Sequence, residues 1–204
     1  MDDFITDYND DNIRKILDEK EQYFKDNIKL PNIFINNINI GWKSYPLIDN
    51  YDGTYFHIIS KSFMNQDISC CPNRVIKCPR MFSYNPMMSD KYTDRQKRAI
   101  CPHKIQCLYI LNNYFSNTNL LIWSRSESTP KGKRTRIKLL DKERKYIVIL
   151  EVKPNGTILF WTGYPIDFDY KIKKFEKEYA RYNSTGGKTY ICSYKQKQGT
   201  PTSK

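Results

Sequence analysis

The chain has 204 residues, of which 39% are hydrophobic and 14% aromatic, so it can pack the core of one large domain and is not expected to be globally disordered. Its longest apolar runs are too short to span a membrane. The N-terminus, MDDFITDYNDD, is acidic, whereas a secretory signal begins with basic residues and an apolar stretch. We therefore expect a soluble, cytoplasmic protein without a membrane partner.

The formal net charge of +12 is distributed unevenly along the chain. Residues 1–50 carry 6 basic and 10 acidic residues, whereas residues 91–204 carry 24 basic and 9 acidic residues. A positive field of this kind attracts polyanions, and nucleic acid is the most common polyanion. A solvated, lysine-rich surface would have the same composition, so both interpretations stay open.

Residues 1–40 are predicted to be an acidic N-terminal segment with one helix and a linker. Helical spacing of apolar residues extends over the first 30 residues, and Pro31 ends it. The apolar residues at this spacing are Ile13, Ile16, Leu17, Tyr23 and Phe24. Residues 32–40 are a linker or a short strand. The charge of the segment suggests that it folds over the basic part of the chain and restrains its activity; the alternative is an ordinary solubilising helix.

The main domain is predicted over residues 41–183. Residues 54–60, TYFHIIS, are rich in aromatic and β-branched types, which indicates a strand that carries His57. Residues 65–90 form an irregular insertion rich in cysteine, proline and methionine. A helix capped by Ser89 or Asp90 would then carry Arg95 and Arg98, and after Pro102 a second helix would run through residues 105–111.

From residue 120 onward the pattern changes to strands joined by turn sequences. The expected strands are 120–126, 134–140, 146–152 and 157–164, followed by a helix over 170–182 that Asp167 or Asp169 caps. Residues 184–204 are predicted to be a flexible basic tail. The predicted fold class is α+β, with helices packed on a four-stranded antiparallel β-sheet meander and with an N-terminal helical extension.

The strand over residues 134–140 has the clearest cluster of charge. Alternation places Arg134, Arg136 and Lys138 on one face and Ile137 and Leu139 on the other. Three cations on one face are unfavourable unless this face meets solvent or a polyanion.

The six cysteines do not form the C-x-x-C pairs that are typical of zinc sites. Four of them and one histidine could in principle converge on a metal: Cys71, Cys78, Cys101, Cys107 and His103. Reduced, partly buried thiols are the more common state in a cytoplasmic protein, so we expect neither a metal nor a cofactor. The sequence also has no P-loop, G-x-G-x-x-G, H-E-x-x-H or G-x-S-x-G motif.

RNA can be cut without a metal, because its own 2′-hydroxyl attacks the adjacent phosphate once a base removes its proton. Such a site needs histidine or glutamate for proton transfer, cations for the phosphate charge, and a hydroxyl or amide for positioning. The chain has two histidines, His57 and His103, and both are near basic residues. His57 could equally be a core residue, and the Pro-His turn favours a structural role for His103.

One long segment resembles a known nuclease family. It runs from residue 132 to residue 166 and reads GKRTRIKLLDKERKYIVILEVKPNGTILFWTGYPI. A Gly-Lys-basic strand, a Tyr-x-Val-x-Leu strand and a closing strand that ends in Thr-Gly-Tyr-Pro are similar to the phage-associated members of the barnase–EndoU–colicin–RelE nuclease superfamily. Residues 95–98 and the Phe-His pair at position 57 also look like the layout of that family, over roughly residues 54–182.

The resemblance implies a metal-independent endoribonuclease that leaves a 2′,3′-cyclic phosphate, of the kind that acts as a toxin or phage-conflict effector with a cognate immunity or antitoxin protein. It implies His57 as the proton-transfer group, Thr162 for substrate positioning, and three arginines for the phosphate. These arginines are Arg98, Arg134 and Arg136. The expected RNA-binding residues are Arg95, Trp123, Arg125, Lys133, Lys138 and Tyr164. The N-terminal segment and the Cys-rich insertion depart from the short family members, which puts the alignment around His57 in doubt.

Two alternatives of other classes remain. A non-catalytic nucleic-acid-binding or inhibitor protein would need the basic strand but no proton-transfer residue. A zinc-stabilised interaction module would depend on the cysteines.

Overall fold

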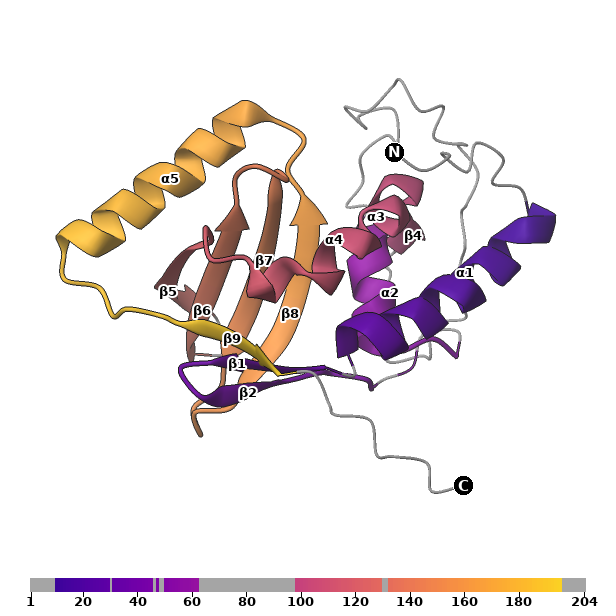
Figure 1. The fold of residues 1–204 in the computed structure, drawn as a ribbon, viewed down its shortest axis with the longest axis horizontal. Coiled ribbons are helices and arrows are strands. Elements are labelled where there is room, and N and C mark those ends of the chain that lie inside the picture. Colours follow the sequence, from indigo (N-terminus) through magenta and orange to yellow (C-terminus); the bar gives the residue numbers. More distant parts are fainter. Residues whose placement is uncertain are drawn as a thin grey trace.

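The fold is α+β, with a curled seven-stranded sheet that has helices on both of its faces (Figure 1) and a separate two-stranded sheet. The computed structural model describes residues 10–29, 31–45, 47, 50–62, 98–129 and 132–195. Within these ranges, no helix is both long and apolar enough to cross a lipid bilayer. The Cys-rich insertion expected at 65–90, together with Arg95, lies outside the described residues.

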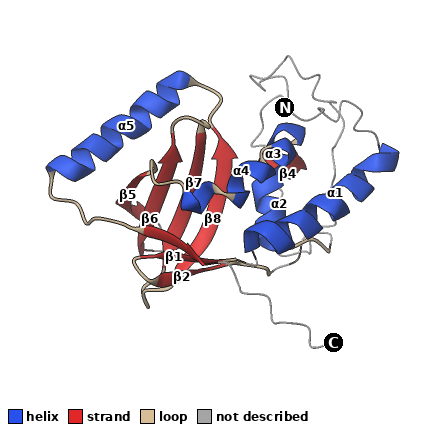
Figure 2. Ribbon diagram, in the orientation of Figure 1, coloured by secondary structure: helices blue, strands red, loops and turns tan. Residues whose placement is uncertain are grey.

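Helices and strands are interspersed along the chain, and Figure 2 shows where each kind lies. The helices are α1 (Asp10–Phe24), the π-helical turn η1 (Lys25–Lys29), α2 (Gly53–Ile59), α3 (Pro102–Gln106), α4 (Leu108–Asn112), the 3-10 turn η4 (Tyr114–Ser116) and α5 (Asp169–Ser184). The strands are β1 (Asn32–Ile35), β2 (Ile38–Gly41), β3 (Ser60–Ser62), β4 (Arg98–Ile100), β5 (Leu121–Thr129), β6 (Gly132–Asp141), β7 (Tyr146–Val152), β8 (Ile158–Pro165) and β9 (Cys192–Lys195).

The predicted four-stranded antiparallel meander is wrong as a description of the sheet. The sheet has seven strands in the order β5-β6-β7-β8-β2-β1-β9, and it is mixed because β2 runs parallel to β8. Two of the three additional strands come from the stretch that was expected to be a linker or a short strand, and the third comes from the predicted tail. Residues 32–41 form a hairpin whose turn residues, Asn36 and Asn37, have φ values of 49° and 66°. Asparagine tolerates this left-handed conformation, which a two-residue hairpin turn requires.

The stretch 184–204 contains β9, so it is not a flexible tail throughout. β9 pairs with β1 from Asn32–Lys195 to Ile35–Cys192. The backbone N–H of Asn36 donates to the carbonyl oxygen of Ile191 at 2.9 Å, and the N–H of Ile191 donates to Oδ1 of Asn36 at 2.8 Å. These contacts join residues 32–36 to the last described residues of the chain, and β9 becomes the edge strand of the sheet.

Strands β5–β8 and helix α5 lie close to their predicted positions, but the N-cap of α5 is neither Asp167 nor Asp169. Phe168 is the N-cap, and it forms no side-chain hydrogen bond to the helix. Asp169 is the first helical residue and accepts a hydrogen bond from Lys145 at 2.8 Å. The single helix expected through residues 105–111 is present as two short helices, α3 and α4, with Pro102 opening α3 at a position where its missing N–H has no cost.

Residues 54–59 form a helix and not the predicted strand, and only Ser60 lies in a strand, β3. Asp52 caps α2, because its Oδ1 accepts from the N–H groups of Thr54 and Tyr55 at 2.8 and 3.2 Å. The side chains of Tyr55, Phe56, Ile58 and Ile59 are all at most 1% exposed. Their spacing fits a helix that is buried on most sides, and burial outweighs the β-propensity of these residues.

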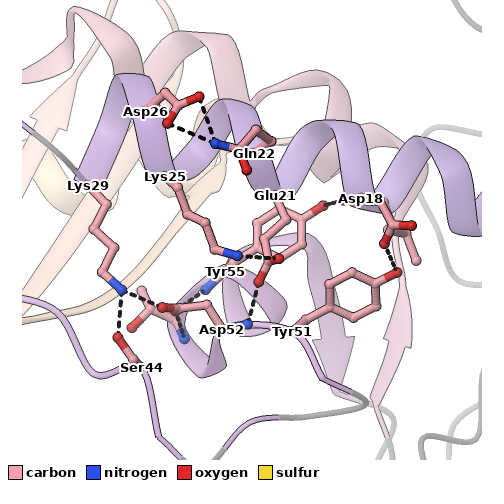
Figure 3. A network of polar contacts seen from close by, with 12 residues as sticks. Asp18, Glu21, Gln22, Lys25, Asp26, Lys29, Ser44, Tyr51, Asp52 and Tyr55 are labelled. Carbon is pink, nitrogen blue, oxygen red and sulfur yellow. Dashed lines mark hydrogen bonds and ion pairs between the residues drawn. The ribbon is translucent and has the colours of Figure 1, made fainter.

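Helix α1 and turn η1 hold α2 through a polar network (Figure 3). Glu21 accepts from the backbone N–H of Asp52 at 2.6 Å, and Lys29 donates to Oδ2 of Asp52 at 2.6 Å. Burial alone would raise the pKa of Asp52, but hydrogen bonds from Lys29, the Tyr55 N–H and Ser44, with the Lys29 charge, lower it overall. The described part of the N-terminal segment therefore stabilises α2. Its contacts do not support the hypothesis that the segment restrains the basic strands.

Candidate active site

Strands β5–β8 have two different faces. Alternation on β6 directs Ile137 and Leu139 into the core cluster that also contains residues of α1, α2 and α4. The opposite face carries Arg134, Arg136 and Lys138, as the sequence predicted, and we call it the cationic face. Directly paired residues share a face of a sheet, so the register also places side chains of the neighbouring strands there. These are Trp123, Arg125 and Glu127 on β5, Ile149 and Glu151 on β7, and Thr162 and Tyr164 on β8.

Each of the three β6 cations of the cationic face has a carboxylate partner. Arg134 lies 3.8 Å from Glu151, and Arg136 lies 3.4 Å from Glu127. The third, Lys138, lies 2.7 Å from Glu178 of α5. The expectation that these cations need solvent or a polyanion is therefore incomplete, because carboxylates of the same fold offset their charge.

Helix α5 covers one half of the cationic face. Phe175 and Tyr179 pack against Trp123 with ring centroids 6.1 Å away in each case, and Trp123 is 1% exposed. Lys138 is 7% exposed, with its Nζ 5.4 Å from the Phe175 ring. Trp123 and Lys138, which were expected to bind RNA, are thus buried beneath α5 and are not open to a ligand in this structure.

The other half of the face brings together a histidine, a tryptophan and an arginine. The Cζ atom of Arg136 lies 5.4 Å from the Trp161 ring centroid, and the His57 ring centroid lies 6.0 Å from it. The two distances together set an upper limit on the separation between the centre of the imidazole ring and the guanidinium carbon. His57 is half-buried, and the side chain of Arg136 is 24% exposed, so both reach the surface of the molecule.

Two features of the backbone position this trio. α2 contacts β8 in space, and His57 is half-buried whereas every other residue of 54–60 is buried, so it points away from the core. On β8, Leu150 pairs with Phe160 while Ile149 pairs with Thr162, so Trp161 is the extra residue of a β-bulge. Bulges redirect side chains and are common next to functional sites. The bulge brings Trp161 onto the cationic side, where it packs against the cluster beneath α5.

Hydroxyl groups stand on the same strand as Trp161. Thr162 is the next residue and is half-buried. Tyr164 lies two residues farther on; burial raises its pKa, the charge of Glu178 adds to this rise, and Arg136 partly offsets it. The phenol therefore stays protonated at neutral pH and can donate a hydrogen bond.

Two carboxylates near the trio were not singled out from the sequence: Glu127, which pairs with Arg136, and Glu151, which lies opposite Arg136 on the next strand. Glu151 is 4% exposed, and its Oε2 lies 3.0 Å from Lys153. For Glu151, a lone carboxylate in an otherwise apolar strand was the available signal. Trp161 was also missed, since an aromatic residue in a β-strand is ordinary and the bulge has no mark in the sequence.

The remaining predicted site residues are placed elsewhere or at the margin. Arg98 lies in β4, and β4 pairs only with β3 of the described strands, so it is not on the predicted helix. Arg125 is exposed on β5 and lies 3.6 Å from Glu178, and Lys133 is exposed near the start of β6. His103 lies 3.7 Å from Asp167 and 4.0 Å from the Cys107 sulfur.

Comparisons with protein-family models, with characterised proteins and with solved structures found no match for this chain. Among the residues that the structure describes, no group of three or more histidine, cysteine, aspartate or glutamate side chains is arranged to hold a metal ion.

Proposed function

We propose that the chain is an endoribonuclease that cuts RNA by attack of the 2′-hydroxyl on the adjacent phosphate, without a metal. The observation that carries the proposal is the Trp161 ring, with the His57 imidazole at 6.0 Å and the Arg136 guanidinium at 5.4 Å. These are a group that can move a proton and a cation that can stabilise a phosphorane, on an accessible part of one surface.

In the proposed reaction, neutral His57 takes the proton of the 2′-hydroxyl, and the freed oxygen forms a bond to phosphorus. The bond from phosphorus to the 5′-oxygen breaks, and this oxygen takes a proton from solvent, to which His57 then releases the proton that it removed. The products are a 2′,3′-cyclic phosphate and a 5′-hydroxyl, so no oxidant or water molecule is consumed. Arg136 stabilises the charge on the phosphate oxygens, and Thr162 holds the substrate by a hydrogen bond.

Trp161 supplies a stacking surface for a base beside the scissile phosphate, since aromatic rings bind unpaired RNA bases in this way. Arg134 extends the positive charge toward the start of β6. The similarity of residues 132–166 to phage-associated nucleases of the barnase–EndoU–colicin–RelE superfamily supports the same reaction. A ribonuclease of that kind acts on cytoplasmic RNA as a toxin and requires an inhibitory partner, and we include both in the proposal.

The test is cleavage of tRNA and total RNA by purified protein in excess chelator. Replacing a general base costs about 10² to 10⁴ in rate, so His57→Ala should lose at least a hundredfold. His103→Ala is the matched control, because it removes the other histidine, which lies beside Asp167. Arg136→Ala should also lose activity, whereas Arg144→Ala, in the exposed turn after β6, should not.

Equal activity of His57→Ala and His103→Ala would contradict the assignment of His57. RNA binding by the wild type without any cleavage would favour the other class, a non-catalytic RNA-binding protein.

A further inference from the structure

Helix α5 separates its acidic and basic residues. Its three carboxylates all pair with cations that lie outside the helix: Asp169 with Lys145 at 2.8 Å, Glu176 with Lys142 at 2.5 Å, and Glu178 with Lys138 at 2.7 Å. The apolar residues of α5 pack against the sheet and are Ile172, Phe175, Tyr179 and Tyr182. All three carboxylates of α5 are therefore paired with cations of other elements.

The opposite side of α5 carries four cations and no carboxylate, with the exposed Tyr170 at its N-terminal end. The cations are Lys173, Lys174, Lys177 and Arg181, which are all exposed. At about 100° per residue they fall within an arc of roughly 100°, and from first to last they extend about 12 Å along the helix. We call these four residues the α5 stripe. Like charges at i, i+4 spacing destabilise an isolated helix slightly. Repulsion within the stripe therefore lowers the stability of α5 slightly in the free protein, and a bound polyanion would relieve this repulsion.

Helix α5, which carries the stripe on its outer side, lies next to the candidate active site. α5 lies on the cationic face of the sheet, over the half that contains Trp123 and Lys138, and the other half holds Arg136 and Trp161. Figure 1 shows α5 at the margin of the molecule, with the sheet on one side of it only. A strand bound along α5 can thus continue onto the open half of the same face.

We propose that the α5 stripe binds the sugar–phosphate backbone of RNA and guides the strand toward Trp161 and His57. The choice of RNA as the ligand depends on the proposed function, whereas the stripe itself does not. Charge complementarity supports a polyanion. A lipid surface fits less well, because membrane-surface helices expose several apolar residues beside their cations. On α5 only Tyr170 of the large apolar residues is exposed, and the four that pack on the sheet are turned away from the stripe.

The test measures the affinity of the full chain for a short, fluorescently labelled single-stranded RNA by anisotropy over a series of salt concentrations. The parent is His57→Ala, so that the RNA stays intact. The stripe variant combines Lys173→Gln, Lys177→Gln and Arg181→Gln. A matched control, with the same loss of two lysines and one arginine, combines Arg14→Gln, Lys15→Gln and Lys20→Gln in α1, away from the cationic face in Figure 1.

Loss of three phosphate contacts should reduce the slope of log K against log salt by about 2 and weaken binding at low salt by tenfold or more. The α1 variant should change the slope by much less. The inference is overturned if the stripe variant binds like its parent, if both variants weaken binding equally, or if only anionic vesicles bind in a stripe-dependent manner.

This result can be separated from that of the proposed function. If the wild type cleaves RNA but the stripe variant binds like its parent, only the inference about α5 fails. If nothing cleaves RNA and binding still depends on the stripe, the inference stands and the ribonuclease proposal fails.

Discussion

Replacing Asp52 tests whether α2, and with it His57, is held in place by the N-terminal helix. Asp52 is 4% exposed, caps α2 and accepts a hydrogen bond from Lys29 at 2.6 Å. Loss of an N-cap costs about 1 kcal/mol, and loss of a hydrogen bond to a charged group costs about 1.5–3 kcal/mol. Asp52→Ala should therefore lower the free energy of unfolding by about 2.5–4 kcal/mol.

Asp52→Asn separates the two contributions. Asparagine caps a helix as well as aspartate does, so this variant should lose only the ionic contribution of about 1.5–3 kcal/mol. The measurement is urea denaturation followed by tryptophan fluorescence and circular dichroism, with unchanged m-values. Asp26→Asn is the matched control, because Asp26 is exposed and contacts Gln22 of α1, and it should change stability by less than about 0.5 kcal/mol.

The reasoning is refuted if Asp52→Ala costs less than about 0.5 kcal/mol, the range of an ordinary surface change. Equal losses for Asp52→Ala and Asp52→Asn would reject the capping contribution alone. A double-mutant cycle with Lys29→Met should give a favourable coupling energy between Lys29 and Asp52.

Three further outcomes follow from burial. Glu178→Gln leaves the buried Lys138 without its carboxylate and should cost about 3–5 kcal/mol in urea denaturation, whereas Glu176→Gln, two residues away with an exposed partner, should cost at most about 1 kcal/mol. Burial raises the pKa of Glu178, but the hydrogen bond and charge of Lys138 outweigh it and lower the pKa below its ordinary 4.5. A carboxyl of this kind stabilises the fold above its unfolded pKa and loses that contribution as the pH falls through the folded pKa. Acidification below about pH 4.5 should therefore destabilise the wild type more than Glu178→Gln, and equal pH profiles would reject this. Burial raises the pKa of Cys107 to about 12, so peptide mass spectrometry should find it alkylated slowly in native protein and quickly in urea; fast native alkylation would contradict its burial.

The sequence predicted strands β5–β8 well, because their residues alternate regularly and turn residues separate them. The alternation of Arg134, Arg136 and Lys138 with apolar residues assigned both faces of β6 correctly. Pro154-Asn-Gly marked the turn before β8, where Gly156 has a φ of 84°. Local patterns of this kind depend only on neighbours in the chain.

The errors concern contacts between distant residues. The segment assigned as a strand, residues 54–60, is mostly helical because Asp52 caps the helix and because α1 and the sheet bury it on most sides. β9 pairs with β1 although most of the chain lies between the two strands, and no local pattern indicates such a pairing. A short strand of this kind is stabilised by its partner and not by its own propensity.

The same limit applies to the candidate site. His57 and Arg136 were proposed from their chemistry and are brought together on Trp161, whereas Trp123 and Lys138 are buried by a helix from a later part of the chain. The carboxylates that pair with the β6 cations come from β5, β7 and α5. Charge counted along one strand could not anticipate these pairs.

The most direct test of the central claim is the chemistry of the RNA ends that the wild-type protein produces in excess chelator. The account predicts fragments with a 2′,3′-cyclic phosphate on one side of each cut and a 5′-hydroxyl on the other, since the 2′-hydroxyl is the nucleophile. Fragments with a 5′-phosphate, or cleavage that appears only when a divalent metal is restored, would contradict it.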